Sequence, residues 1–142
     1  MSKFFSREPI DVDFINTKHR RINSKIPCEG SVEILDTLDK YESRSMHGQI
    51  PLVWDKAKDF NIYDKLGNKW IDLTSTIFVT NIGHSNSYLL EKLQNLLKSE
   101  LLHTYAYTNE IRAKYLKKLI EFSPSNFEKA FLLSAGTETT EA

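Results

Sequence analysis

Cysteine, glycine and proline are scarce in this chain of 142 residues, and neither sign of charge prevails. Cys28 is the single cysteine, which excludes an internal disulfide framework. It has no histidine close by in sequence, so we interpret it as an incidental thiol rather than a nucleophile. Lys and Arg total 19, as do Asp and Glu, and this balance gives no long-range field that favours nucleic acid or an anionic membrane.

Long apolar runs are also absent. No run approaches the ~18 residues of a membrane-spanning helix, and the apolar pair near the N-terminus is too short for the core of a signal peptide. The basic cluster of residues 18–21 has no interleaved aromatics, so we expect a solvated tail rather than a nucleic-acid site. These observations predict a soluble, cytoplasmic protein with neither nucleic-acid nor membrane partners, and with no metal site.

Apolar residues make up 40% of the chain, enough for a core, and much of this content recurs at helical spacing. One amphipathic helix is expected from Ser31, as its cap, to about Met46. A second begins at Ser85 or Asn86 and carries a leucine stripe that is typical of a core face. A third is expected from a Thr108 cap and ends at Pro124.

Between the first two helices the pattern changes to a β unit. Residues 60–63 and 70–73 are rich in strand formers, and residues 64–68 form a turn in which Gly67 can adopt a positive φ. His84 follows shortly before the second helix, and we expect it to make a structural hydrogen bond rather than to act in catalysis. Strands mixed with helices in this way predict an α/β protein.

The last twelve residues are the most informative. The apolar run 131–133 is stopped by small residues and predicts a buried strand. Thr137 is the expected cap of the helix that follows. Unpaired N–H groups at a helix start attract phosphate, and Gly136 has no side chain to block a close approach. The pattern therefore predicts a strand, a tight turn and a phosphate-binding helix start.

Residues 134–142 read Ser-Ala-Gly-Thr-Glu-Thr-Thr-Glu-Ala. This segment resembles the Asn-Ser-Gly-Thr-Glu-Ala-x-Glu-Ala loop of the class III pyridoxal-phosphate aminotransferases, which are fold-type-I enzymes. In that family the loop amides hold the cofactor phosphate, and the resemblance assigns this role to Ala135, Gly136 and Thr137. Ala135 replaces a usual Ser or Thr, so a hydroxyl contact is lost, and Thr139 replaces a usual Ala.

Two further segments carry the resemblance, which runs from about Ser31 to Ala142. The first is the hairpin, similar to the family's Tyr-Asp-x-x-Gly-x-x-Tyr/Trp-Ile/Leu-Asp. The second is residues 74–84, where Asn81, Gly83 and His84 match but Thr76 replaces a usual glycine. The resemblance implies that Ile77 borders the substrate. It also implies that the polar-aromatic loop 102–109 lies at a dimer interface, where Tyr105 and Tyr107 are candidates to line the substrate pocket.

The resemblance implies transfer of an amino group from an amine or ω-amino acid to a 2-oxo acid, with pyridoxal 5'-phosphate as cofactor and a homodimeric parent. It implies an N-terminal arm (1–30), a small-domain segment with a helix and β-hairpin (31–75), and the start of a large, mainly parallel sheet domain (76–142). No lysine follows Gly136, so we assign the family's Schiff-base lysine to no residue of this chain and expect an inactive N-terminal fragment. Three alternatives remain: a glutamate-1-semialdehyde aminomutase-like enzyme fragment, a non-catalytic phosphate-binding module, and a dimerisation module.

Overall fold

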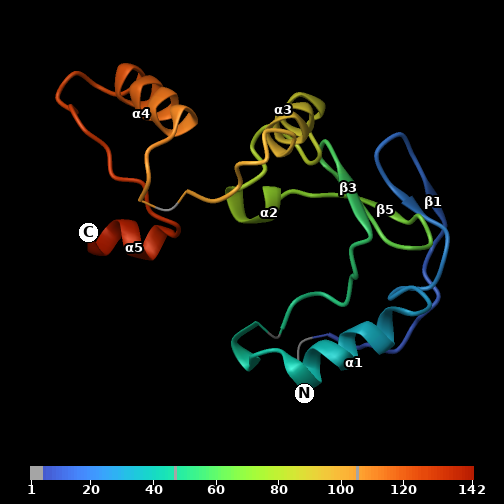
Figure 1. The fold of residues 1–142 in the computed structure, drawn as a ribbon. Coiled ribbons are helices and arrows are strands. Elements are labelled where there is room, and N and C mark those ends of the chain that lie inside the picture. The colour runs from blue at the N-terminus through green and yellow to red at the C-terminus, as the bar shows by residue number, and fades with distance from the viewer. Residues whose placement is uncertain (1–4, 47, 105) are drawn as a thin grey trace. The chain divides into compact units, whose positions relative to one another are not determined.

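The computed structural model describes residues 5–46, 48–104 and 106–142. They divide into two compact units, Met1–Gln94 and Asn95–Ala142, each of which is described by itself. Figure 1 follows the elements along the chain, with all five strands in the first unit. The second unit holds the end of one helix and two further helices.

The strands form one antiparallel sheet in the order β1-β2-β5-β4-β3. Their bounds are β1 Ile15–Asn16, β2 Arg21–Ile22, β3 Lys56–Lys58, β4 Asn61–Tyr63 and β5 Lys69–Ile71. The hairpin expected around residues 60–73 is confirmed as β4 and β5, with Ile62 opposite Trp70. This antiparallel sheet lies within residues 15–71, and the mainly parallel sheet expected for the large domain (76–142) stays a prediction.

The turn between β4 and β5 is built on buried polar groups. Gly67 has a φ of 76°, as expected. The Asp64 carboxylate accepts hydrogen bonds from the backbone N–H groups of Leu66 and Asn68, both at 3.0 Å. The fully buried Asn68 side chain accepts from the backbone N–H of Asn23 at 2.8 Å, and this bond fastens the N-terminal arm to the hairpin. Because buried polar groups need partners, these bonds fix the arm's position in the first unit.

The first helix differs from its prediction at both ends. α1 spans Ser31–Tyr41, and a separate 3-10 turn at Arg44–Met46 completes the expected length. Gly30 is the cap, because Ser31 is buried and its hydroxyl lies 3.2 Å from the Cys28 sulfur. Burial raises the pKa of the Cys28 thiol, which opposes reactivity.

The next two long helices have polar caps, as expected, with one shift in position. α3 spans Ser87–Leu97, and Asn86 caps it by accepting from the N–H of Leu89 at 3.2 Å. α4 spans Glu110–Phe122, but its cap is Asn109 rather than Thr108. The Asn109 oxygen lies 2.8 Å from the Arg112 nitrogen, so the amide side chain replaces the hydroxyl. The remaining helices are the short α2 (Ser75–Phe78) and α5 (Gly136–Glu141).

Apolar side chains are less buried than the sequence predicts. The leucine stripe of α3 is not a core face within the described residues, since Leu89, Leu93 and Leu97 are 44–59% exposed. Residues 131–133 form no strand, and Phe131 is 76% exposed. A buried strand needs a neighbouring strand, and the described residues of the second unit form none.

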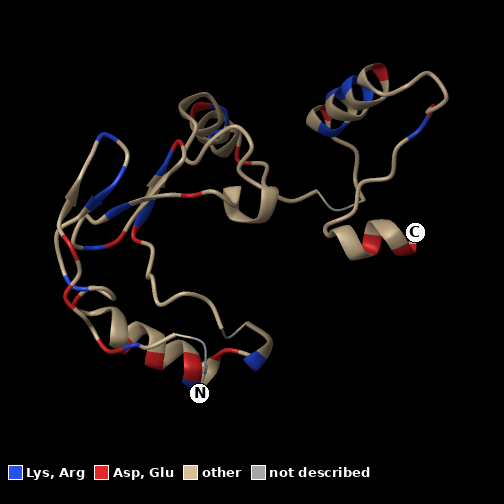
Figure 2. Ribbon diagram, turned by 180° about the vertical axis from the view of Figure 1, so that it is seen from behind, with Lys and Arg blue, Asp and Glu red and all other residues tan. Residues whose placement is uncertain are grey.

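Charges of both signs are spread along the chain (Figure 2). α4 carries the ion pairs Lys114–Glu110 and Lys117–Glu121, whereas the charged residues of α5, Glu138 and Glu141, are both acidic. Over the described residues, no helix has the length and apolarity needed to cross a membrane. The same residues contain no group of three or more His, Cys, Asp or Glu side chains that could hold a metal ion.

Candidate functional site

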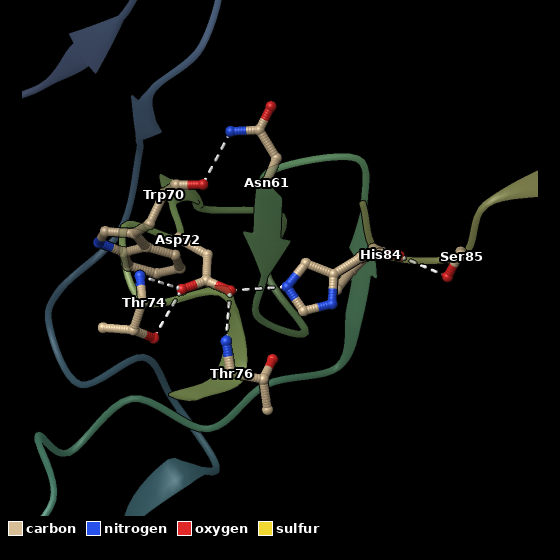
Figure 3. Close-up of polar contacts among 8 residues, drawn as sticks. Asn61, Trp70, Asp72, Thr74, Thr76, His84 and Ser85 are labelled. Atoms are coloured by element: carbon tan, nitrogen blue, oxygen red, sulfur yellow. Dashed lines mark hydrogen bonds and ion pairs between the residues drawn. The ribbon is translucent and has the colours of Figure 1, made fainter. Parts of the chain in front are cut away.

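An aspartate–histidine pair lies beside the end of β5. The Asp72 Oδ2 is 2.7 Å from the His84 Nε2, and their side chains are 3% and 10% exposed (Figure 3). The structural hydrogen bond expected for His84 is thereby confirmed. Burial, the largest single influence, raises the pKa of Asp72, but hydrogen bonds from His84 and Thr74 outweigh it and lower that pKa from 3.8 to about 2. Asp72 is therefore ionised at neutral pH.

His84 is held from the backbone as well as through its ring. It exchanges backbone hydrogen bonds with Asp59, at 2.8 and 2.6 Å. Gly83 precedes it with a φ of 88°, and a Cβ at that position would lie 3.3 Å from the Cα of Asp59. Trp54 contacts the imidazole edge-on with 5.8 Å between ring centroids. Only glycine combines the positive φ with this close approach, so Gly83 allows His84 to reach Asp72.

The segment after Asp72 is a left-handed helical turn. Ser75, Thr76, Ile77 and Phe78 have φ values of 49°, 53°, 56° and 65°. The turn closes with a backbone hydrogen bond of 2.9 Å from Phe78 to Thr74. Left-handed conformation costs roughly 1–2 kcal/mol for each residue other than glycine. A turn of four such residues persists only where its surroundings impose it.

Asp72 supplies that support. Its Oδ1 accepts from the backbone N–H and the hydroxyl of Thr74, at 2.9 and 2.8 Å. Its Oδ2 accepts from the backbone N–H of Thr76 at 3.2 Å, in addition to the bond with His84. Figure 3 shows the carboxylate between the two threonines and the imidazole. One buried carboxylate thus joins the strained turn to His84, which pairs with Asp59 between β3 and β4.

The left-handed turn explains one departure noted in the sequence. Residue 76 is a usual glycine in the family that this chain resembles, and here Thr76 adopts the conformation that favours glycine. We expect Thr76→Gly to raise the free energy of unfolding by about 1 kcal/mol, since the backbone N–H to Asp72 is kept. Urea denaturation followed by circular dichroism measures this.

Thr37→Gly, in the interior of α1, is the matched control. It is expected to destabilise the protein by roughly 0.5–1 kcal/mol, because glycine there adds backbone entropy to the unfolded chain and removes the hydroxyl that donates to the Glu33 carbonyl at 2.8 Å. Equal destabilisation by the two substitutions would contradict the strain assigned to residue 76.

An open cavity of about 340 Å³ lies over this region of the first unit. The Asp72–His84 pair and Ser75 line it, with Asn81 and Ile82. Ile77, the expected substrate neighbour, is 79% exposed on the turn and is not part of the lining. The structure therefore presents Ile77 at the surface of the first unit, two residues along the chain from Ser75 in the cavity lining.

The terminal turn belongs to the second unit. α5 begins at Gly136 with Ala135 as its cap residue, so Thr137 lies inside the first turn and is not the cap. Ala135 has no side-chain acceptor, and Glu138 takes over part of the role by accepting from the backbone N–H groups of Ser134 and Ala135, at 3.0 and 3.2 Å. This capping interaction occupies the N–H of Ala135, which is one of the three backbone amides expected to bind phosphate.

The two remaining amides are open. Among the described residues, the backbone N–H groups of Gly136 and Thr137 have no hydrogen-bond partner. A Cβ on Gly136 would meet no atom within 4 Å. α5 carries no Lys or Arg, so no cationic side chain of this helix would assist the backbone amides. The geometry fits a phosphate oxygen at Gly136 and Thr137, and fits Ala135 less well.

The loop 102–109 contains the two tyrosines that are candidates to line the substrate pocket. Tyr107 is 80% exposed, and Tyr105 lies outside the described residues. Asn109 donates to the Thr104 hydroxyl at 2.8 Å and holds the base of the loop. Ile77 belongs to the first unit and Tyr107 to the second, as do residues 135–137, and the structure describes each unit separately.

Sequence reasoning missed the role of Asp72 in the pair. Thr74, two residues later, is a local signal, because an Asp side chain commonly accepts from the backbone N–H at that spacing. The bond to His84 joins residues twelve positions apart and has no such signal.

The sequence of this chain matches known proteins over most of its length. Residues 42–142 match the family model described as aminotransferase class-III. The acetylornithine aminotransferase of Clostridium acetobutylicum is 31% identical over 96 residues, which are 68% of this chain and 24% of that protein. The ornithine aminotransferase of Saccharomyces cerevisiae is 26% identical over 111 residues, or 78% of this chain and 26% of that protein. The chain thus spans about a quarter of the length of these relatives.

Solved structures show the same fold. The acetylornithine aminotransferase of Elizabethkingia anophelis superposes with a TM-score of 0.70 at 24% identity, over 78% of this chain and 28% of that one. The taurine:2-oxoglutarate aminotransferase of Bifidobacterium kashiwanohense, solved in complex with PLP and glutamate, gives 0.66 at 20% identity, over 77% of this chain and 25% of that one. The expected fold class, the N-terminal part of an α/β aminotransferase, is confirmed. The family model matches residues 42–142, which are most of this chain, so the chain belongs to the class III aminotransferases.

Proposed function

We propose that this chain is part of a pyridoxal-phosphate-dependent aminotransferase that moves an amino group from an amine or ω-amino acid to a 2-oxo acid. The family match over residues 42–142 carries this proposal. Relatives named for acetylornithine and ornithine support an amino donor of that kind, and a structural neighbour named for taurine and 2-oxoglutarate supports a 2-oxo acid acceptor.

The cofactor phosphate is assigned to the start of α5. The backbone N–H groups of Gly136 and Thr137 are the donors, and the open space at Gly136 admits the phosphate. The N–H of Ala135 donates to Glu138 and is therefore not assigned to the phosphate. Ala135 lies in the turn next to the two donors. When bound, pyridoxal phosphate supplies an electron sink for cleavage of bonds at the amine carbon. The residues of this segment bind and orient, and none of them moves a proton.

Two aromatic or aliphatic side chains are proposed to contact the substrate. Ile77 is 79% exposed on the left-handed turn, and Tyr107 is 80% exposed in the loop before α4. Both present apolar surface to solvent, which suits contact with the carbon chain of an amine or ω-amino acid. The domain division at residues 30 and 75 and a homodimeric parent remain part of the same proposal.

We propose that these 142 residues do not turn over substrate by themselves. No lysine follows Gly136, and the family's covalent attachment of the cofactor requires one. Incubation with pyridoxal phosphate, ornithine and 2-oxoglutarate is expected to yield no glutamate. Glutamate formation by the purified chain, with every other protein excluded, would contradict this.

The phosphate assignment predicts a large effect of Gly136→Pro on binding of pyridoxal phosphate. Gly136 is the first residue of α5, where proline is tolerated, and Ala135 is already extended at φ −137° and ψ 155°, as a residue before proline prefers. The substitution therefore removes one N–H donor and leaves the helix intact. We expect the Kd to rise about tenfold or more, since a hydrogen bond to a charged group contributes roughly 1.5–3 kcal/mol.

Thr137→Ala is the matched control, because it keeps the backbone N–H that the proposal uses. Its Kd is expected to stay within about threefold of the unsubstituted chain. Absorbance titration with pyridoxal phosphate measures both variants. Unchanged affinity in Gly136→Pro, with circular dichroism showing a folded chain, would remove the phosphate from this turn. Selectivity for a nucleotide over pyridoxal phosphate would instead support a different phosphate-binding module.

A further inference from the structure

We propose that Asp72 and His84 act as a positioning pair that holds the turn Ser75–Phe78 left-handed and so sets the direction in which Ile77 faces the substrate. The assignment of Ile77 to the substrate rests on the proposed function. The control of the turn by the pair rests only on the contacts described below.

The carboxylate of Asp72 accepts hydrogen bonds from Thr74, just before the turn, and from Thr76, its second residue. Oδ1 accepts from the N–H and hydroxyl of Thr74, and Oδ2 accepts from the N–H of Thr76. The side chain is 3% exposed, so water does not replace these bonds readily. Asp72 thus fixes the backbone at the residue before the turn and at its second residue.

His84 connects this carboxylate to the sheet. Its ring contacts Asp72 at 2.7 Å and Trp54 edge-on, and its backbone pairs with Asp59. Gly83 brings the imidazole into this position through its positive φ. The position of the carboxylate is therefore determined by residues outside the turn.

Packing does not account for the conformation of the turn. Ile77 and Phe78 are 79% and 80% exposed, so no apolar burial imposes positive φ on them. Thr76 and Ile77 are β-branched, and such residues are disfavoured in the left-handed region. Within the part of the chain that the structure describes, the hydrogen bonds from Asp72 are the contacts, apart from the turn's own backbone bonds, that oppose relaxation. The pair is therefore the element that selects the conformation.

The test compares four variants of the chain by NMR. A residue with positive φ gives a strong nuclear Overhauser effect between its own amide and α protons. We expect Asp72→Ala and His84→Ala to lose this signal at Thr76 and Ile77, with amide hydrogen exchange at Thr76 accelerated about tenfold. His84→Gln is expected to retain the signal, because its side-chain amide can still donate to Asp72. His103→Ala, at an exposed histidine of the second unit, is expected to change nothing.

Each outcome decides the proposal. Retention of the strong signal in both alanine variants, with the sheet resonances unchanged, would overturn it. Loss of the signal in His84→Gln as well would show a general structural effect and would also overturn it. If Asp72→Ala does not fold, His84→Ala and His84→Gln alone give the comparison. The readout uses neither cofactor nor substrate, so failure of pyridoxal phosphate binding would refute the proposed function and leave this result unaffected.

Discussion

Replacement of Gly83 by alanine is expected to lower the free energy of unfolding by about 3 kcal/mol. Two penalties combine there. A residue other than glycine at a φ of 88° costs roughly 1–3 kcal/mol. The new Cβ would also lie 3.3 Å from the Cα and 3.4 Å from the carbonyl oxygen of Asp59, and backbone atoms in a paired segment move only with further cost of roughly 1–3 kcal/mol.

Gly30→Ala separates these two penalties. Gly30 has a similar φ of 81°, but a Cβ there would meet no atom within 4 Å. Only the conformational penalty applies, so we expect a loss of about 1 kcal/mol. Urea unfolding of both variants gives the comparison. Equal losses for Gly30→Ala and Gly83→Ala would show that the contact with Asp59 has no energetic weight.

Acidification is expected to remove about 2 kcal/mol of stability through Asp72. The pKa of this carboxyl is about 2 in the folded protein and 3.8 when unperturbed. Because the folded pKa is the lower one, the stabilisation is fully present above pH 3.8 and is lost as the pH falls from there to about 2. The side chain is 3% exposed, so solvent screening reduces the effect little.

The matched variant is Asp72→Asn, which cannot titrate at this position. The difference in unfolding free energy between the unsubstituted chain and Asp72→Asn is expected to shrink across this pH window. Asp11→Asn, whose carboxylate is 88% exposed in an ion pair with Lys25, is expected to show no comparable change. A constant difference between pH 5 and pH 2 would contradict the low pKa assigned to Asp72.

The sequence predicted the features that short-range patterns determine. The hairpin around Gly67 follows from a turn of suitable residues between strand formers, and both strands form where expected. The cap at Asn86 follows from its place before an amphipathic run. Such features depend only on neighbouring residues, so they can be predicted without knowledge of the tertiary structure.

Features that depend on distant partners were not predicted. The short strands β1 and β2 exist because the N-terminal arm pairs with the hairpin, and the contact between Asn23 and Asn68 spans 45 residues. The buried strand expected at residues 131–133 was wrong, since an apolar run forms a strand only beside a pairing partner. At the candidate site, the hydrogen bond of His84 was expected, but its partner Asp72 required the fold.

The central claim concerns the two open amides at the start of α5, and NMR of the isotope-labelled chain tests it most directly. Addition of pyridoxal phosphate is expected to shift the amide signals of Gly136 and Thr137 more than any others. Pyridoxal, which lacks the phosphate, is expected to leave them unchanged. The account would be contradicted if pyridoxal phosphate moved neither signal, or if pyridoxal moved both to the same extent.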